Sequence, residues 1–326
     1  MEADRRSWTM GVPTAVVVWA AITSLAGFMG NWMGLGGRRF AVSLGVAAVL
    51  FGFEWFCAAP IVQQFVMNAF GGHGPLISPL VPLGAVLVYS FAITGDVRLA
   101  IAGAAYAVLP ALLLAGSARK PPGTWEDYAA AALLWVPVQF HWMYKLFPYP
   151  APLTHTLSIG LALAAGVAGF VLLRRLEGVG YAVEWRRGFG WNFGLLFVVY
   201  AAIAIVLGMR IGFLTFAPSL TRGPSLPIVV LGILFFTAWP EEFLFRGILQ
   251  NLFARTLKSD WAGWAVASVL FGLSHLHHAP YPNWKYALMA TIAGLFYGLA
   301  WMRTRSLLPG ALVHAAVDIC WHILFR

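Results

Sequence analysis

The sequence predicts an all-α protein, a polytopic bundle of about nine to eleven transmembrane helices. Of its 326 residues, 60% are hydrophobic and only 10% are charged, whereas roughly a quarter of the residues in an ordinary soluble domain are charged. Backbone polar groups cannot stay unpaired in lipid, so only helices or a closed β-barrel can cross a membrane. The apolar runs are long and lack the alternation of barrel strands, which favours helices.

Each spanning helix needs about 20 mostly apolar residues, and about eleven segments meet this requirement. The first follows Arg5 and Arg6 and shows no convincing signal-peptidase site, so we expect it to be retained as a span. The fifth is interrupted by Pro137, Gln139 and His141. The expected segments are 11–33, 40–62, 75–95, 97–116, 128–147, 152–173, 190–209, 226–249, 261–277, 284–302 and 307–325.

Two breaks divide this series. The longest polar stretch, 174–187, is the expected boundary between a front and a rear bundle, and 217–227 is rich in Pro, Ser and Gly. The net charge of +9 comes from short Lys and Arg clusters between apolar runs, which indicates topology signals and not a nucleic-acid partner. Cys57 and Cys320 both lie in apolar segments, so neither a disulfide framework nor a CxxC metal site is expected.

Ionisable residues inside the expected spans point to chemistry, because placing them in a bilayer is energetically costly. Most acidic residues lie in loops, but four lie inside expected spans. Three of these four are among the last hundred residues. Basic and imidazole groups accompany them there. The residues concerned are Glu54 in the front part and Glu241, Glu242, Arg246, His275, His314, Asp318 and His322 in the rear part.

The first of these groups is the run of Glu241, Glu242 and Arg246. On an α-helix, residues four apart share a face, so Glu242 and Arg246 are expected to form an ion pair. Glu241 points about 100° away and has no partner nearby in the sequence. Such a carboxylate beside a neutralised pair suits a general base. The alternative is an interfacial charge cluster at a helix end.

The other two groups are His275, at the end of one span, and His314 with Asp318 in the final span. A lone membrane histidine can also be a helix-packing residue, and the four-residue spacing of His314 and Asp318 also fits a structural hydrogen bond. If the three helices converge, however, two carboxylates and two imidazoles suffice to activate water and stabilise an oxyanion. Hydrolysis is the predicted chemistry.

These three motifs, Glu241-Glu242-xxx-Arg246, Phe271-xxx-His275 and His314-xxx-Asp318, resemble those of the CAAX protease and bacteriocin-processing (CPBP or Abi) family of glutamate-type intramembrane peptidases. The likeness covers about residues 227–322. We therefore expect residues 1–220 to form an N-terminal transmembrane bundle of unassigned role and 221–326 the catalytic helical core.

The resemblance implies a role for each motif residue. Glu241 and His275 would activate the attacking water, Glu242 and Arg246 would support them, and His314 and residue 318 would stabilise the oxyanion. The family often has Asn at the last position, and an ionised Asp318 cannot donate a hydrogen bond. Two roles for Asp318 stay open: a protonated donor, or an anion that orients His314.

No cofactor is expected, because the chain has no HExxH motif and the family is glutamate-type, although a set of His, Glu and Asp leaves zinc open. The expected partners are the lipid bilayer and a membrane-anchored protein or peptide, cleaved at a C-terminal tail, a CAAX-like sequence or a leader. The expected location is a multi-pass position in a prokaryotic inner membrane. The alternatives are a non-catalytic scaffold or self-immunity protein, and a small-solute transporter.

Overall fold

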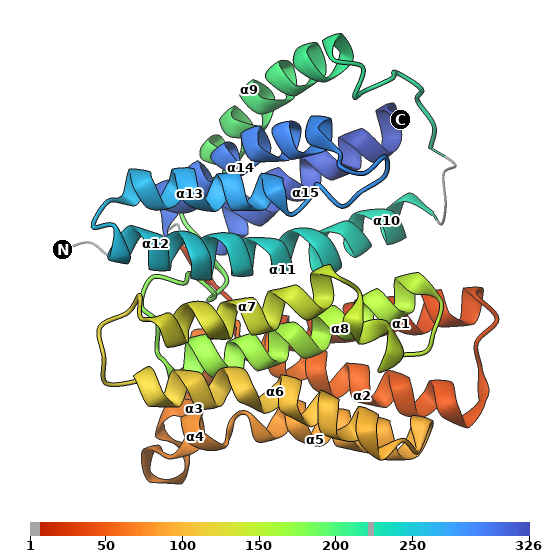
Figure 1. Ribbon diagram of the computed structural model, residues 1–326, viewed down its shortest axis with the longest axis vertical. Coiled ribbons are helices and arrows are strands. Elements are labelled where there is room, and N and C mark those ends of the chain that lie inside the picture. Colours follow the sequence, from red (N-terminus) through yellow and green to blue (C-terminus); the bar gives the residue numbers. More distant parts are fainter. Residues whose placement is uncertain (1–6, 221–224) are drawn as a thin grey trace. The chain divides into compact units, whose positions relative to one another are not determined.

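The computed structural model describes residues 7–220 and 225–326 and is 77% helical (Figure 1). In this part of the chain the strands are two residues long, β1 (Trp8–Thr9) and β2 (Glu184–Trp185). Eight of the described helices are long and apolar enough to cross a membrane. The predicted all-α transmembrane bundle is confirmed, and the chain is an integral multi-pass membrane protein.

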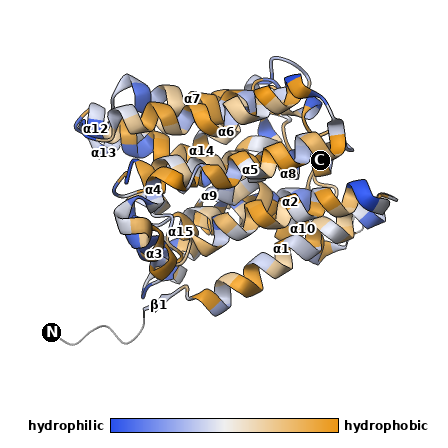
Figure 2. Ribbon diagram, turned by 90° about the horizontal axis from the view of Figure 1, so that it is seen from below, coloured by the Kyte–Doolittle hydropathy of each residue, from blue (hydrophilic) through white to orange (hydrophobic). Residues whose placement is uncertain are grey.

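Hydrophobic residues run along the helices and many remain exposed (Figure 2). Trp191, Phe65 and Val17 are among the large apolar side chains on the surface. A soluble monomer rarely exposes large contiguous apolar patches, whereas lipid tails are a suitable environment for them. The apolar surface therefore fits a protein that contacts lipid.

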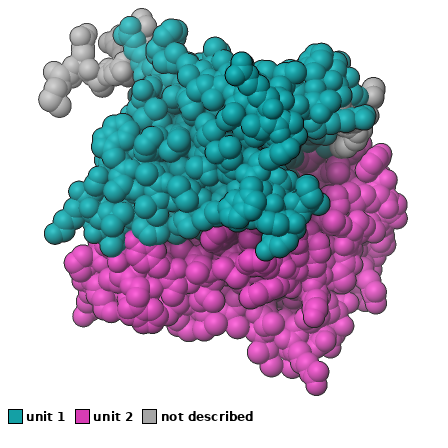
Figure 3. Space-filling view, turned by 45° about the horizontal axis from the view of Figure 1, so that its top comes forward, with its two compact units in different colours: residues 1–8, 178–326 teal, residues 9–177 magenta. Residues whose placement is uncertain are grey.

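The chain divides into two compact units, coloured in Figure 3. Unit 2 is Thr9–Glu177, and unit 1 is Gly178–Arg326 with the N-terminal segment that ends at Trp8. The limit between Glu177 and Gly178 falls within the polar stretch 174–187 that the sequence predicts as a boundary. The division of roles between residues 1–220 and 221–326 stays a prediction.

Unit 2 has a helix in each of the six expected front segments. Its 15-residue helix α7 begins with a capping box, in which Thr124 and Asp127 cap the first turn reciprocally. One further helix, α3, starts at Pro60, a residue that favours a first helical position. The elements are α1 (Val12–Trp32), α2 (Gly37–Phe56), α3 (Pro60–Gly72), α4 (Gly74–Ile77), α5 (Leu80–Tyr89), η1 (Ser90–Thr94), α6 (Val97–Ser117), α7 (Trp125–Gln139), η2 (Trp142–Lys145), α8 (Ala151–Gly166) and η3 (Val167–Leu173).

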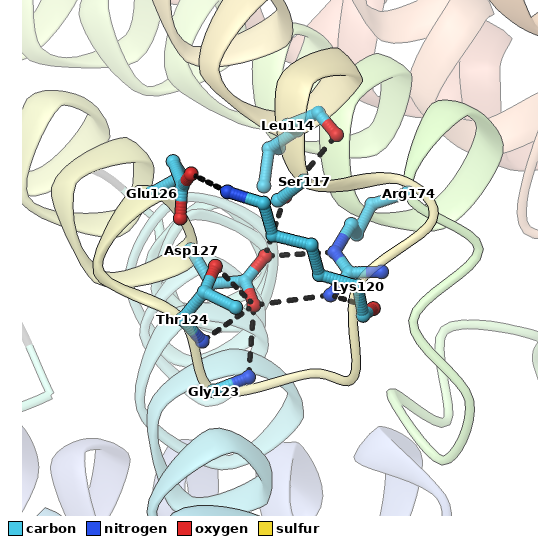
Figure 4. A network of polar contacts seen from close by, with 8 residues as sticks. All are labelled: Leu114, Ser117, Lys120, Gly123, Thr124, Glu126, Asp127 and Arg174. Carbon is cyan, nitrogen blue, oxygen red and sulfur yellow. Dashed lines mark hydrogen bonds and ion pairs between the residues drawn. The ribbon is translucent and has the colours of Figure 1, made fainter.

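A buried polar network ties the start of α7 to the residue that follows η3 (Figure 4). Arg174 Nε donates to Asp127 Oδ1 at 2.8 Å, and both side chains are almost fully buried. The other carboxylate oxygen of Asp127 accepts from the backbone N–H groups of Gly123 at 2.8 Å and Thr124 at 3.1 Å. The network fixes the loop 118–124 within unit 2.

Unit 1 contains the five expected rear segments. The segment that begins at Leu226 continues to Thr256, beyond the expected end at residue 249. The helix expected over 261–277 ends at Leu273. The elements are α9 (Phe189–Arg210), α10 (Leu226–Ile233), η4 (Leu234–Ala238), α11 (Trp239–Glu242), η5 (Phe243–Gln250), α12 (Asn251–Thr256), α13 (Asp260–Leu273), α14 (Trp284–Thr304) and α15 (Leu307–Leu324).

Glycines let the helices of unit 1 approach each other closely, as is common between membrane helices. A Cβ on Gly272 of α13 would lie 1.8 Å from Thr291 Oγ1 of α14, and a Cβ on Gly294 would lie 3.1 Å from Ser268 Cα. Figure 1 shows α13 and α14 side by side. This close packing holds the backbones of α13 and α14 against each other.

Candidate active site

The two adjacent glutamates lie on α11, a short helix between two π-helical segments, η4 and η5. Pro240 explains the irregularity, because its ring would clash with the carbonyl of residue 236 in a regular α-helix. A π-helical turn widens the backbone and relieves this clash, and such turns are frequent at functional sites. The helix thus continues through Pro240 and still presents Glu241 and Glu242 in succession.

Glu242 is a fully buried carboxylate with two partners. Arg246 Nε donates to its Oε2 at 3.1 Å, so the ion pair expected from the four-residue spacing is present, and both side chains have no exposed surface. The other oxygen, Oε1, lies 3.0 Å from Nδ1 of His314. An ionised carboxylate only accepts hydrogen bonds, so His314 Nδ1–H is the donor. Glu242 therefore joins α11 to η5 and α15.

The second ring nitrogen of His314, Nε2, faces two other acids. It lies 3.5 Å from Asp318 Oδ2 and 3.8 Å from Glu241 Oε2. With Nδ1–H donated to Glu242, a neutral ring would turn the lone pair of Nε2 toward these oxygens. A protonated ring would instead direct an N–H toward both acids, so the two nitrogens of His314 serve different partners.

Glu241 differs from its neighbour in both exposure and bonding. Its side chain is 31% exposed, whereas that of Glu242 is 0% exposed. Its Oε2 makes no hydrogen bond to any residue in the described ranges 7–220 and 225–326. Glu242 is therefore engaged on both oxygens, whereas Glu241 keeps a buried oxygen without a hydrogen bond 3.8 Å from His314 Nε2.

His275 lies in the turn that follows α13, not inside the helix. Its Nδ1 is 2.8 Å from the carbonyl oxygen of Phe271, which can only accept, so Nδ1 carries the hydrogen and Nε2 keeps a lone pair. Within the described chain, no hydrogen bond or ion pair joins His275 to Glu241. The Phe271 ring lies between the two histidines, with its centroid 4.9 Å from that of His275 and 5.6 Å from that of His314.

Aromatic rings enclose the charged groups from α14 and α13. The ring of Tyr297 stacks on His314, and the guanidinium carbon of Arg246 lies 4.9 Å from the Phe271 centroid and 5.9 Å from that of Tyr297. The sequence gives no sign of the role of Tyr297, because an aromatic residue in an apolar span is ordinary packing. The contact between Glu242 and His314 was also missed, since the two residues are 72 positions apart.

In the described residues no group of three or more His, Cys, Asp or Glu side chains is arranged to hold a metal ion. Glu242 is engaged by Arg246 and His314. What the arrangement provides is one accessible carboxylate, one imidazole with a free lone pair and one imidazole that faces two acids. These are groups for acid–base chemistry.

Comparison with known proteins bears on the same region. Residues 223–320 match the family model described as type II CAAX prenyl endopeptidase Rce1-like. The chain is also similar to an uncharacterized 24.3 kDa protein of Escherichia coli, with 29% identity over 178 residues that cover 52% of this chain and 76% of the relative. No solved structure matches. The family match confirms the resemblance noted in the motifs, and residues 223–320 are similar to the Rce1-like CAAX protease family.

Proposed function

We propose that the protein is a glutamate-type intramembrane endopeptidase that cleaves a membrane-associated protein or peptide. The family match supports cleavage of peptide bonds. The observation that carries the mechanism is the contrast between the two glutamates: Glu242 is buried and paired, whereas Glu241 is partly exposed and its Oε2 makes no hydrogen bond within the described residues.

In the proposed reaction, Glu241 takes a proton from a water molecule as that water attacks the carbonyl carbon of the scissile bond. The lone pair of His275 Nε2 assists in orienting the water. Nε2–H of a protonated His314 donates to the oxyanion, because Asp318 and Glu241 stabilise the positive charge on that ring. The proton held by Glu241 then passes to the leaving amine, and the peptide bond breaks.

Glu242 and Arg246 act as support in this proposal. Their pairing neutralises two buried charges, and Glu242 fixes His314 through Nδ1. A histidine held through one nitrogen presents the other in a defined direction. Asp318 faces that second nitrogen, so we propose that it acts as an anion beside the imidazolium.

The test is cleavage by purified protein in lipid nanodiscs, with a farnesylated CAAX peptide, a C-terminal membrane-anchor peptide and a leader peptide as substrates. Glu241→Gln is expected to lower turnover by about 10²–10⁴-fold, as removal of a general base does, without loss of thermal stability. Glu184→Gln, at a glutamate of β2 that pairs with Arg186, is the matched control. Equal turnover by wild type and Glu241→Gln would contradict the mechanism, and peptide binding without cleavage by the wild type would favour a scaffold.

A chelator arm of the same assay addresses zinc. We expect EDTA and phenanthroline to leave cleavage unchanged and the active protein to hold no stoichiometric zinc. Zinc that tracks activity across preparations would move Glu241, His275 and His314 from acid–base roles to ligand roles.

We further propose a prokaryotic inner membrane as the location, because the described helices include eight that could cross a membrane and a similar protein occurs in Escherichia coli. The substrate would be a protein or peptide anchored in that membrane, and its cleavage site a C-terminal tail, a CAAX-like sequence or a leader. A comparison of membrane-protein termini from cells with and without the protein identifies the substrate. Unchanged termini would contradict the endopeptidase proposal in those cells.

A further inference from the structure

The ring of Tyr297 on α14 lies flat against the imidazole of His314 on α15. The ring centroids are 4.5 Å apart and the ring planes differ by only 16°. Both side chains are buried, with 1% and 3% of their surface exposed. Among the aromatic contacts of His314, this is the stacked one, because Phe271 meets the same imidazole edge-on at 84°.

The packing around Tyr297 holds its ring in this place. Phe271 contacts it at a steep angle of 69°, with centroids 6.0 Å apart. One residue further along α14, the carbonyl of Gly298 accepts a hydrogen bond from Gln250 Nε2 at 3.2 Å. A Cβ on Gly298 would lie 2.6 Å from Gln250 Oε1, so a glycine permits this approach of α14 to η5. These contacts hold the Tyr297 ring in place against His314.

The stacking is well suited to a charged imidazole. The face of a phenol ring carries a partial negative charge, and a cation on that face is stabilised. The titratable and charged groups that face or surround His314 are Glu241 and Glu242 of α11, Arg246 of η5, His275 after α13 and Asp318 of α15. The three acids meet the two ring nitrogens, whereas Tyr297 covers a face of the ring.

We propose that Tyr297 is a positioning residue of this site, which holds the His314 ring on the line between Glu242 and the two other acids and stabilises its protonated form. Tyr297 then covers a face of the imidazole, Phe271 contacts it edge-on, and Glu242 holds Nδ1. Nε2, the atom assigned to the oxyanion, faces Asp318 and Glu241. This inference rests on the proposed peptidase function, and it adds a residue that the motifs do not contain.

The test compares ring chemistry at position 297. Tyr297→Phe keeps the stack and is expected to cleave within about threefold of wild type, whereas Tyr297→Leu is expected to lose about tenfold in kcat with KM changed by less than about twofold. The protonated His314 is active, so the alkaline limb of the pH profile should move to lower pH in Tyr297→Leu, by roughly half a unit to one unit. Tyr106→Leu, a buried tyrosine of unit 2 that donates to Leu134 O, is the control and should leave the limb in place.

If Tyr297→Leu does not fold, fluorinated phenylalanines at position 297 replace it in the test, because they keep the packing of an aromatic ring. Each added fluorine weakens the negative face of the ring, so the alkaline limb should move stepwise to lower pH. Histidine-labelled NMR spectra, with His314 assigned from a His314→Asn variant, follow the same titration without substrate. An unchanged titration in all variants would overturn the inference about Tyr297, whereas a shifted titration in a protein that cleaves nothing would uphold it and contradict the peptidase function alone.

Discussion

Nδ1 of His314 lies 3.0 Å from Oε1 of Glu242, so the histidine of the last helix is anchored by the second glutamate of the motif and not by Asp318 four residues away. Asp318 lies at the opposite nitrogen, 3.5 Å from Nε2. Glu242 therefore anchors the ring at one nitrogen, and Asp318 faces the other. This separation makes the contributions of the two acids measurable.

Replacement of Arg246 should destabilise the protein, because it leaves the buried carboxylate of Glu242 without its cation. Breaking a buried pair by removing one partner typically costs about 3–5 kcal/mol. We expect Arg246→Ala to lower the thermal unfolding midpoint and to lose most of the peptidase activity. Arg305→Ala removes one partner of the half-exposed pair with Asp260 and should cost about 0–1 kcal/mol. Similar midpoints for both variants would show that the Glu242–Arg246 pair contributes little.

Asp318→Asn distinguishes the two roles of that residue. As an anion beside Nε2 of His314, Asp318 favours the protonated ring, so the amide should move the alkaline limb of the cleavage profile to lower pH, by about one unit. Activity at acidic pH should change little, because Glu242 still orients the ring. A limb that moves to higher pH would instead identify Asp318 as a hydrogen-bond donor. Asp318→Ala, measured in parallel, reports simple loss of the side chain.

Gly310 of α15 is expected to tolerate no side chain, because a Cβ there would lie 2.9 Å from Oε2 of Glu242, the atom bonded to Arg246. Gly310→Ala must displace that oxygen or the helix, and such overpacking typically costs about 1–3 kcal/mol. We expect at least a roughly tenfold loss of turnover together with a lower unfolding midpoint. Gly232→Ala, on α10 where nothing lies within 4 Å of a new Cβ, should retain activity and stability.

Asp127 gives unit 2 a pH-dependent stability. Burial raises the pKa of Asp127, but the hydrogen bonds from Arg174 and the backbone of Gly123 and Thr124 outweigh it and hold the pKa below its ordinary value. A lowered folded-state pKa stabilises the protein above the unfolded value of about 3.9, and this stabilisation is lost as the pH falls through the folded value.

Thermal unfolding of Asp127→Asn between pH 3 and 8 tests this effect. The variant should have a lower midpoint than wild type at pH 7, by about 3 kcal/mol in stability because Arg174 loses its buried partner. The gap should begin to narrow below about pH 4, where the carboxylate is protonated in the unfolded chain, and it should close as the pH falls through the lower folded-state pKa. A gap that stays constant over the whole range would contradict a role for the charge.

The positions of the helices follow from local sequence. Apolar runs locate a helix in each of the eleven expected segments, although only eight of the described helices are long and apolar enough to cross a membrane. The four-residue spacing of Glu242 and Arg246 is enough to predict their ion pair. The helix α3 was missed because its apolar run is short and ends in Gly71 and Gly72. The end of α13 at Leu273 was also misplaced, since residues 274–277 contain no Gly or Pro that would mark a helix end.

The parts of the site that escaped prediction all depend on contacts between helices distant in sequence. The spacing of His314 and Asp318 suggests that they pair, yet Glu242, 72 residues earlier, takes the Nδ1 hydrogen bond. Tyr297 lies between these motifs in a span with no polar signal. A single sequence reports the faces of one helix, whereas the stacking of Tyr297 on His314 is decided by how α14 and α15 pack.

The unequal burial of the two adjacent glutamates has a consequence for how such a protein can change. Glu242 joins the continuous span Leu226–Thr256 to α15, so we expect its loss to lower stability along with activity, whereas Oε2 of Glu241 makes no hydrogen bond within the described residues. A descendant that abandons catalysis while it keeps its architecture should therefore lose Glu241 first and keep Glu242, Arg246 and His314. The identity of residue 241 alone would then distinguish a working peptidase from a binding protein of the same shape.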